Sequence, residues 1–296
     1  MEITSTDDCN TLQNDMKELE KWSDKWLLRF HPDKCKVLSA GKRSTPEFEY
    51  KLCDTKLQAT DKEKDIGVVV DNQLNFEDHM NEKINKANSI MGLIRRTFSY
   101  LDEPTFITLF KALVRPHLEY ANSVWNPYKK KHVTALENVQ RRATKLVPGL
   151  KDLSYEDRLR KLKLPTLTYR RKRGDMIETF KITSGLYDNA FIPLLEIKKD
   201  NTTRGHSKKL YQHRANKDLR KNFFTNRIVN AWNNLPENVI NAKNVNIFEH
   251  RLDNHWKNQD LVYNYESNLT TGLEIKIDED VELSIVANGQ RSEEDL

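Results

Sequence analysis

Cysteine, glycine and proline are all scarce in this chain of 296 residues, which holds three, nine and nine of them. Cys9, Cys35 and Cys53 are odd in number and lack the close pairing of zinc ligands, which argues against a disulfide framework or a zinc site. The low glycine and proline content excludes a fibrous or low-complexity chain. Unpaired thiols favour a reduced, intracellular setting, nuclear or cytoplasmic.

Long apolar runs are missing as well. No window approaches the ~18 apolar residues of a membrane span, and the polar, acidic residues 1–8 do not have the pattern of a secretory signal. The composition therefore predicts a globular protein without membrane contact. The length suits one large domain or two to three small ones.

Positive charge is concentrated in the middle of the chain. Residues 125–221 hold 25 Lys and Arg against 10 Asp and Glu, a net charge of +15, whereas the whole chain carries +5. Residues 257–296 have a net charge of −7 and are expected to be flexible. Because clustered cations release the counterions of phosphates, the middle predicts contact with nucleic acid. The alternative is a set of solvated helix faces.

Residues 1–72 predict a helix followed by a small antiparallel set of strands. Capping side chains at residues 5–8 precede apolar residues at three- and four-residue steps, which predicts a helix over 8–26. Alternating or β-branched residues predict strands at 35–39, 48–52 and 65–70. Within the last strand we expect Ile66 and Val68 in the sheet core, and Gly67 at a close backbone approach.

Helical periodicity dominates after residue 76. The expected helices cover 77–98, 103–121, 130–146, 155–162, 167–183, 216–233 and 246–256, with a loop over 185–215 and a poorly ordered end after about 265. The predicted fold class is therefore α+β, mostly α. It comprises an N-terminal helix with a few strands, a helical bundle and a C-terminal helical region.

Several sequence blocks in a fixed order carry a family resemblance. They are the segments 12–13, 22–26 and 30–37, Lys64-Asp65-Ile66-Gly67-Val68, the segments 113–120, 125–127 and 136–145, and Arg170-Arg171-Lys172-Arg173-Gly174-Asp175. In this order they resemble the reverse transcriptase of non-LTR (LINE-type, jockey/CR1-like) retrotransposons, from residue 1 to about 260. The resemblance implies the C-terminal part of that RNA-directed DNA polymerase. Its parts would be the end of the palm at 1–72, a thumb-like bundle at 73–150, a basic helical region at 151–262 and an acidic tail at 263–296.

The resemblance also implies where catalysis would lie. In the family, the metal-binding aspartates precede the first helix of this sequence, so we expect no catalytic residues, no metal ligands and no polymerisation by this chain alone. Mg²⁺ would belong to the complete enzyme. Asp7 and Asp8 are interpreted as helix-capping residues. Lys34 matches the motif D lysine, which can protonate the leaving pyrophosphate in a complete enzyme, although a surface lysine is the favoured reading here.

Nucleic-acid contacts follow from the same resemblance. The strands near residues 50–52 and 66–70 resemble the primer grip, and a thumb packs a helix into the minor groove of an RNA–DNA duplex, which it reads by shape and phosphates. Residues 115–120 are expected to serve packing and ion pairing. The candidate nucleic-acid-binding residues are Arg95, Arg96, Lys129, Lys130, Lys131, Arg141, Arg142, Lys145, Arg170, Arg171 and Arg173.

Two functions remain open from the sequence. One is a truncated reverse transcriptase, inactive alone, that binds RNA or RNA–DNA duplex. The other is a non-enzymatic helical interaction protein or an inert retrotransposon relic. The salt dependence of duplex binding distinguishes them, whereas the sequence does not specify the oligomeric state.

Overall fold

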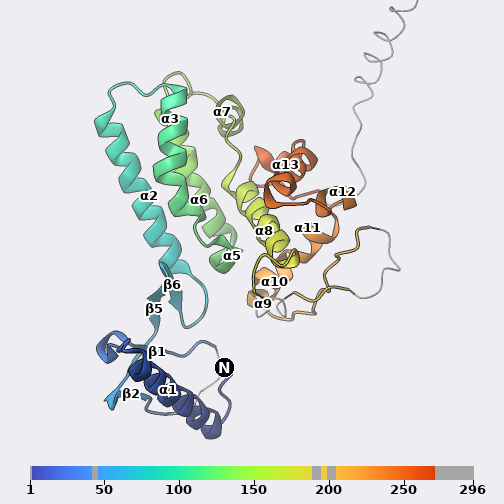
Figure 1. Cartoon of the computed structure of the whole chain (residues 1–296). Coiled ribbons are helices and arrows are strands. Elements are labelled where there is room, and N and C mark those ends of the chain that lie inside the picture. The colour runs from blue at the N-terminus through green and yellow to red at the C-terminus, as the bar shows by residue number, and fades with distance from the viewer. Residues whose placement is uncertain (1, 42–45, 189–194, 199–204, 271–296) are drawn as a thin grey trace, which may run out of the picture.

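Helices make up most of the molecule, and the strands form three separate two-stranded sheets. The computed structural model describes residues 2–41, 46–188, 195–198 and 205–270 (Figure 1). Figure 1 shows a small N-terminal part at the bottom, a group of long helices above it, and the C-terminal helices to one side. The prediction of an α+β, mostly α fold is confirmed.

The N-terminal helix α1 (Thr6–Trp26) starts at a complete capping box. The Ser5 hydroxyl accepts a hydrogen bond from the amide of Asp8 at 3.2 Å, and the Asp8 carboxylate accepts one from the amide of Ser5 at 2.8 Å. Gln13 then ties the helix to the first hairpin, because its side chain both donates to and accepts from the backbone of Lys51. The capping role predicted for Asp8 is confirmed.

The short strands that follow pair in both directions. They are β1 (Lys36–Leu38), β2 (Lys51–Leu52), β3 (Thr55–Lys56), β4 (Gln58–Thr60), β5 (Lys62–Asp65) and β6 (Val68–Asp71), and the 3₁₀ turn η1 (Pro32–Lys34) precedes them. The pairs β2–β3 and β5–β6 are antiparallel hairpins. β1 and β4 are parallel, so the prediction of an entirely antiparallel set is wrong. The β2–β3 hairpin lies between β1 and β4 in the sequence, and the chain reversal at this hairpin lets β4 run in the same direction as β1.

The segment 65–70 contains a turn where one strand was predicted. Ile66 and Gly67 both have positive φ angles, 41° and 80°, and separate β5 from β6. Ile66 is 80% exposed, so its placement in the sheet core is wrong, whereas Val68 is buried as expected. The run of β-branched residues concealed the turn, and Gly67 was its one local signal.

A group of long helices follows the β5–β6 hairpin. It comprises α2 (Glu77–Thr97), α3 (Glu103–Leu109), the π-helical turn η2 (Phe110–Val114), α4 (Arg115–Glu119), α5 (Asn122–Trp125), α6 (Lys130–Ala143), the 3₁₀ turn η3 (Thr144–Leu146) and α7 (Tyr155–Leu162). The helix expected over 103–121 widens into a π turn just before Pro116. Proline lacks the amide that an α-helix needs there.

The helices α2 and α6 run parallel. Lys131 of α6 donates to Glu77 of α2 at 2.9 Å, and Arg142 donates to Asn88 at 3.1 Å. Both contacts join residues 54 positions apart, so the two helices advance together in one direction. Phe110, Leu118 and Leu136 are buried in the hydrophobic core to which α2 and α6 both contribute.

The C-terminal region is built on α8 (Leu167–Thr183). The shorter helices around it are α9 (Asp218–Asn222), α10 (Phe224–Arg227), α11 (Val229–Asn233), α12 (Glu237–Ile240) and α13 (Val245–Trp256), and the 3₁₀ turn η5 (Asp260–Val262) follows them. The single helix predicted over 216–233 is wrong, because Phe223 is extended and separates α9 from α10. The side chain of Asn226 donates to the carbonyl of Arg220 and satisfies the end of α9.

The buried residues form two hydrophobic cores, and the boundary between them falls after residue 167. The first contains Val68 and extends to Leu167, so α7 belongs with the long helices and not with the region that starts at 151. The second begins at Tyr169 and ends at Val262. Leu269 packs against this second core, so the ordered region extends beyond the predicted limit of 262. Residues 271–296, the rest of the predicted tail, lie outside the described residues.

Candidate nucleic-acid interface

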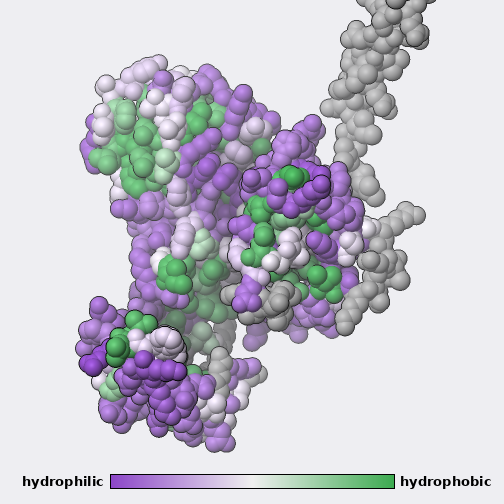
Figure 2. Space-filling view, in the orientation of Figure 1, coloured by the Kyte–Doolittle hydropathy of each residue, from purple (hydrophilic) through white to green (hydrophobic). Residues whose placement is uncertain are grey.

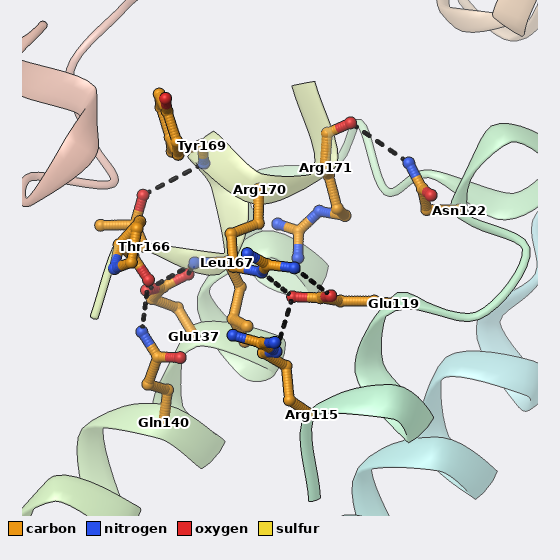
Figure 3. A network of polar contacts seen from close by, with 11 residues as sticks. Arg115, Glu119, Asn122, Glu137, Gln140, Thr166, Leu167, Tyr169, Arg170 and Arg171 are labelled. Carbon is orange, nitrogen blue, oxygen red and sulfur yellow. Dashed lines mark hydrogen bonds and ion pairs between the residues drawn. The ribbon is translucent and has the colours of Figure 1, made fainter. Parts of the chain in front are cut away.

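Arg170 at the start of α8 faces inward and pairs with a carboxylate (Figure 3). Its guanidinium forms a bidentate ion pair with Glu119 of α4. Nη2 donates to one carboxylate oxygen at 2.8 Å, and Nε donates to the other. Arg115 approaches the same carboxylate at 3.8 Å. The ion-pairing role predicted for residues 115–120 is confirmed. The charge of Arg170 is thereby used within the protein.

Arg171 lies deeper, in a polar cluster with Glu137. The two residues are 3% and 1% exposed. Glu137 accepts hydrogen bonds from the Tyr155 hydroxyl at 2.7 Å and from the amide of Leu167 at 3.1 Å. Burial raises the pKa of Glu137 and lowers the pKa of Arg171, because each charge is removed from water. A phosphate cannot reach Arg171 at this position, so its prediction as a nucleic-acid contact is wrong.

Arg173 connects α8 to the C-terminal helix. It pairs with Asp253 and lies 3.2 Å from Glu249, both on α13. These carboxylates raise its pKa, chiefly through the hydrogen bond to Asp253. The arginine-rich start of α8 therefore attaches this helix to its neighbours on two sides.

A further buried pair joins α8 to α10. Arg227 donates to Asp175 at 2.8 Å and also to the backbone carbonyls of Asn122 and Ser123, each at 3.1 Å. The α5 corner, α8 and α10 thus meet at one guanidinium. Sequence reasoning missed Arg227, since a single arginine in a predicted helix carries no signal for carbonyl groups about a hundred residues away.

The remaining candidate cations lie on the long helices. Lys129, Lys130, Lys131, Arg142 and Lys145 are exposed along α6 and its end, and Arg95 and Arg96 are exposed at the end of α2. Extending the offset of 54 residues places Lys145 level with Met91, one turn before Arg95. The parallel packing of α2 and α6 therefore places cations that are about 50 residues apart in sequence toward the same end of the helix pair. We call Arg95, Arg142 and Lys145 the α2–α6 seam.

Arg141 differs from its neighbour Arg142. Its guanidinium stacks on the rings of Tyr155 and Tyr265, at 5.1 and 5.6 Å from the ring centroids, and its Nε is buried. These contacts fix Arg141 against α7 and the C-terminal segment. Its truncation would loosen packing, so it is unsuited to a test of binding.

The residues considered for catalysis do not form a metal site. Lys34 is exposed in η1. Asp8 bonds to the backbone amides and hydroxyls of Thr4 and Ser5, which lower its pKa to about 2. Across the described ranges, no group of three or more His, Cys, Asp or Glu side chains could hold a metal ion.

Comparisons with known proteins give little further information. No family model matches the chain, and no solved structure matches it. An uncharacterized protein of Caenorhabditis elegans, B0403.1, is 26% identical over 135 residues, which cover 45% of this chain and 68% of the worm protein. Among the described residues, no helix is both long and apolar enough to cross a membrane.

Proposed function

We propose that this chain is the C-terminal part of a non-LTR retrotransposon reverse transcriptase, comprising the end of the palm, the thumb and the C-terminal region, and that it is inactive alone but binds RNA or RNA–DNA duplex through the α2–α6 seam. The observation that carries the proposal is the parallel register of α2 and α6, which places the exposed residues Arg95, Arg142 and Lys145 toward the same end of the helix pair. A row of cations on a rigid helical pair matches a row of phosphates, which requires shape and charge but no base contact.

The position of the β5–β6 hairpin supports the same proposal. Lys62 and Lys64 of β5 form ion pairs with Asp78 and Glu82 of α2, at 2.8 and 2.9 Å. The hydroxyl of Tyr120 donates to the carbonyl of Ile66 at 2.9 Å. The hairpin tip is therefore held at the base of α2, where a grip on a primer strand would need to be fixed relative to a thumb.

A salt titration tests the proposal. The affinity of the full chain for a 16-base-pair RNA–DNA hybrid is measured by fluorescence anisotropy at several salt concentrations. Each phosphate contact contributes about 0.9 to the slope of log affinity against log salt. The triple variant Arg95→Ala, Arg142→Ala, Lys145→Ala should therefore lower the slope by about 2 to 3 and weaken binding at ~50 mM salt at least about 10-fold.

The matched control removes three exposed lysines elsewhere: Lys17, Lys243 and Lys257, each replaced by Ala. It changes the net charge by the same amount and should leave most of the affinity and the slope. An equal loss in both triple variants would mean that net charge alone attracts the duplex, and would contradict a defined interface.

The second candidate function is a non-enzymatic protein-interaction module. Exposed hydrophobic side chains favour it, namely Leu19, Trp22 and Trp26 on α1 and Leu93 and Leu113 on the long helices. Figure 2 shows a hydrophobic patch over the end of α2 and α3, and such patches mark protein contacts. An absence of duplex binding at ~50 mM salt would favour this second function.

A further inference from the structure

A groove of about 440 Å³ lies where three parts of the chain meet. Its walls come from the β6–α2 corner, the α5–α6 corner and the segment around α9. Figure 2 shows hydrophobic side chains in the recess between the base of α2 and the C-terminal helices. The apolar lining residues are Val70, Leu74, Phe76, Met80, Val124, Pro127, Leu219 and Phe223.

The charged residues of the groove are all cations. Lys129, Lys217 and Arg220 line it with exposed side chains, and no carboxylate belongs to the lining. Within the described part of the chain, no ion pair joins any of these three residues to an acid. The guanidinium of Arg220 lies 5.6 Å from the centroid of the Phe223 ring. The groove thus combines an aromatic surface with three exposed cations, of which Lys129 also interacts electrostatically with Glu77; Arg227, a further lining residue, pairs with Asp175.

His132 also contributes to the lining of the groove. The residue is 7% exposed, and its Nε2 is buried and lies 3.6 Å from a carboxylate oxygen of Glu77, with which it pairs when protonated. His132 therefore contributes ring surface to the wall and no accessible hydrogen-bonding group.

We propose that this groove binds one unpaired nucleotide, with its base against the aromatic and apolar wall and its phosphate at Lys129, Lys217 and Arg220. A base offers a flat face for the Phe223 ring, and a phosphate offers negative charge to the three exposed cations of the rim. The volume accommodates a single nucleotide and no duplex. The occupant is either a free nucleotide or the unpaired end of a strand bound at the α2–α6 seam. Only the second source rests on the proposed function.

Two binding measurements test the proposal. A nucleoside 5′-monophosphate is titrated into the full chain by calorimetry, with inorganic pyrophosphate as the anion without a base. A hybrid with a four-nucleotide single-stranded overhang is then compared with the blunt hybrid by anisotropy. Binding of the monophosphate in preference to pyrophosphate, or tighter binding of the overhang hybrid than of the blunt one, is the expected result. The first points to a free nucleotide and the second to a strand end.

The variant Phe223→Ala, Lys217→Ala should weaken the preferred ligand at least about five-fold, because it removes a base–aromatic stack and a phosphate contact. It should leave the blunt hybrid unaffected, whereas the seam variant weakens both hybrids. The control Tyr211→Ala, Lys221→Ala removes an equally exposed aromatic residue and lysine outside the groove. Arg220→Glu alone, a rim substitution, should also weaken the ligand if the double variant unfolds.

Three results would overturn the proposal. They are the absence of both preferences, that is, equal affinity for pyrophosphate and the monophosphate together with equal affinity for the overhang and blunt hybrids; unchanged ligand binding in the groove variants; and an equal loss in the Tyr211, Lys221 control. Loss of blunt-hybrid binding in the seam variant is read separately, so the duplex proposal and the groove proposal can fail independently.

Discussion

At the scale of single residues, the positive charges of this chain lie in two kinds of environment. Arg170, Arg171 and Arg173 stand within six residues of each other, yet each faces carboxylates of the protein itself. Arg142 and Lys145 look similar in sequence and are exposed. The density of cations in the sequence predicted contact with a polyanion for the arginines of α8 and for Arg142 and Lys145 alike. The two groups differ because the fold brings carboxylates to the arginines of α8, and no local sequence pattern indicates those carboxylates.

His79 carries a prediction about pH at the same scale. Its ring is fully buried beside Trp125, and burial, assisted by the charge of Lys83, lowers its pKa from 6.5 to about 4. The unfolded chain therefore binds this proton more readily than the folded one. The free energy of unfolding should decrease as pH falls from about 6.5 to about 4, by up to about 3 kcal/mol.

Urea unfolding at pH 7, 6, 5 and 4.5 measures this decrease for the native chain and for His79→Gln. In the native chain, the amide of Val69 donates a hydrogen bond to Nδ1 of His79 at 3.2 Å. The glutamine side chain can accept this hydrogen bond but has no ring that titrates. The stability of the variant should fall less steeply over this range. Parallel curves for the two proteins would show that His79 is not responsible.

At the scale of secondary-structure elements, the β5–β6 hairpin offers a stabilising substitution. Ile66 has a positive φ of 41° and points into solvent, a conformation that branched residues avoid. Asn is favoured before Gly in such two-residue turns. Ile66→Asn should therefore raise the free energy of unfolding by about 0.5 to 1 kcal/mol, and its backbone carbonyl still accepts from Tyr120.

Thermal unfolding measures this gain, and Gly67→Ala provides the opposite case. Gly67 has a φ of 80°, and a methyl group there would meet the Tyr120 ring at 3.5 Å. The alanine variant should be less stable than the native chain. A lower melting temperature for Ile66→Asn would mean that the exposed isoleucine makes contacts that the turn depends on.

The helices show how far local sequence predicts elements. The helix expected over 155–162 and the one expected over 167–183 have the observed bounds, because Ser154 and Thr166 cap them through their side chains. The segment 216–233 has helical periodicity but breaks at Phe223. Arg227 there bonds to Asp175 and to the carbonyls of Asn122 and Ser123, and these contacts depend on the tertiary structure.

At the scale of the whole molecule, α8 lies at the boundary of the two hydrophobic cores and contributes residues to both of them. Thr166 at its start donates to the carbonyl of Leu261 at 2.7 Å, and Arg227 links its middle to the α5 corner. Hydrophobic periodicity predicted the helical class, and with the family resemblance it predicted the order of the parts. It could not locate the boundary at residue 167, because the apolar residues of α7 do not show which core they join. Burial also depends on the tertiary structure, so the sequence identified the eleven candidate cations but not which of them are exposed and which are buried.

Removing Arg227 should destabilise the entire chain and not one region. Arg227→Ala leaves the carboxylate of Asp175 buried without its partner, a change that costs about 3 to 5 kcal/mol. Urea unfolding followed by tryptophan fluorescence measures the loss, with Lys243→Ala as an exposed control expected within about 0.5 kcal/mol of the native chain. A loss below about 1 kcal/mol would show that water enters and solvates Asp175.

The inward-facing guanidinium groups of α8 have a practical consequence for handling the protein. Ions in the buffer screen exposed charges far more strongly than buried ones. On the proposed function, a concentrated chloride wash should therefore release polynucleotide from the outer lysines and arginines while the folded protein stays intact. Purification can use this difference in salt sensitivity to remove nucleic acid without unfolding the protein.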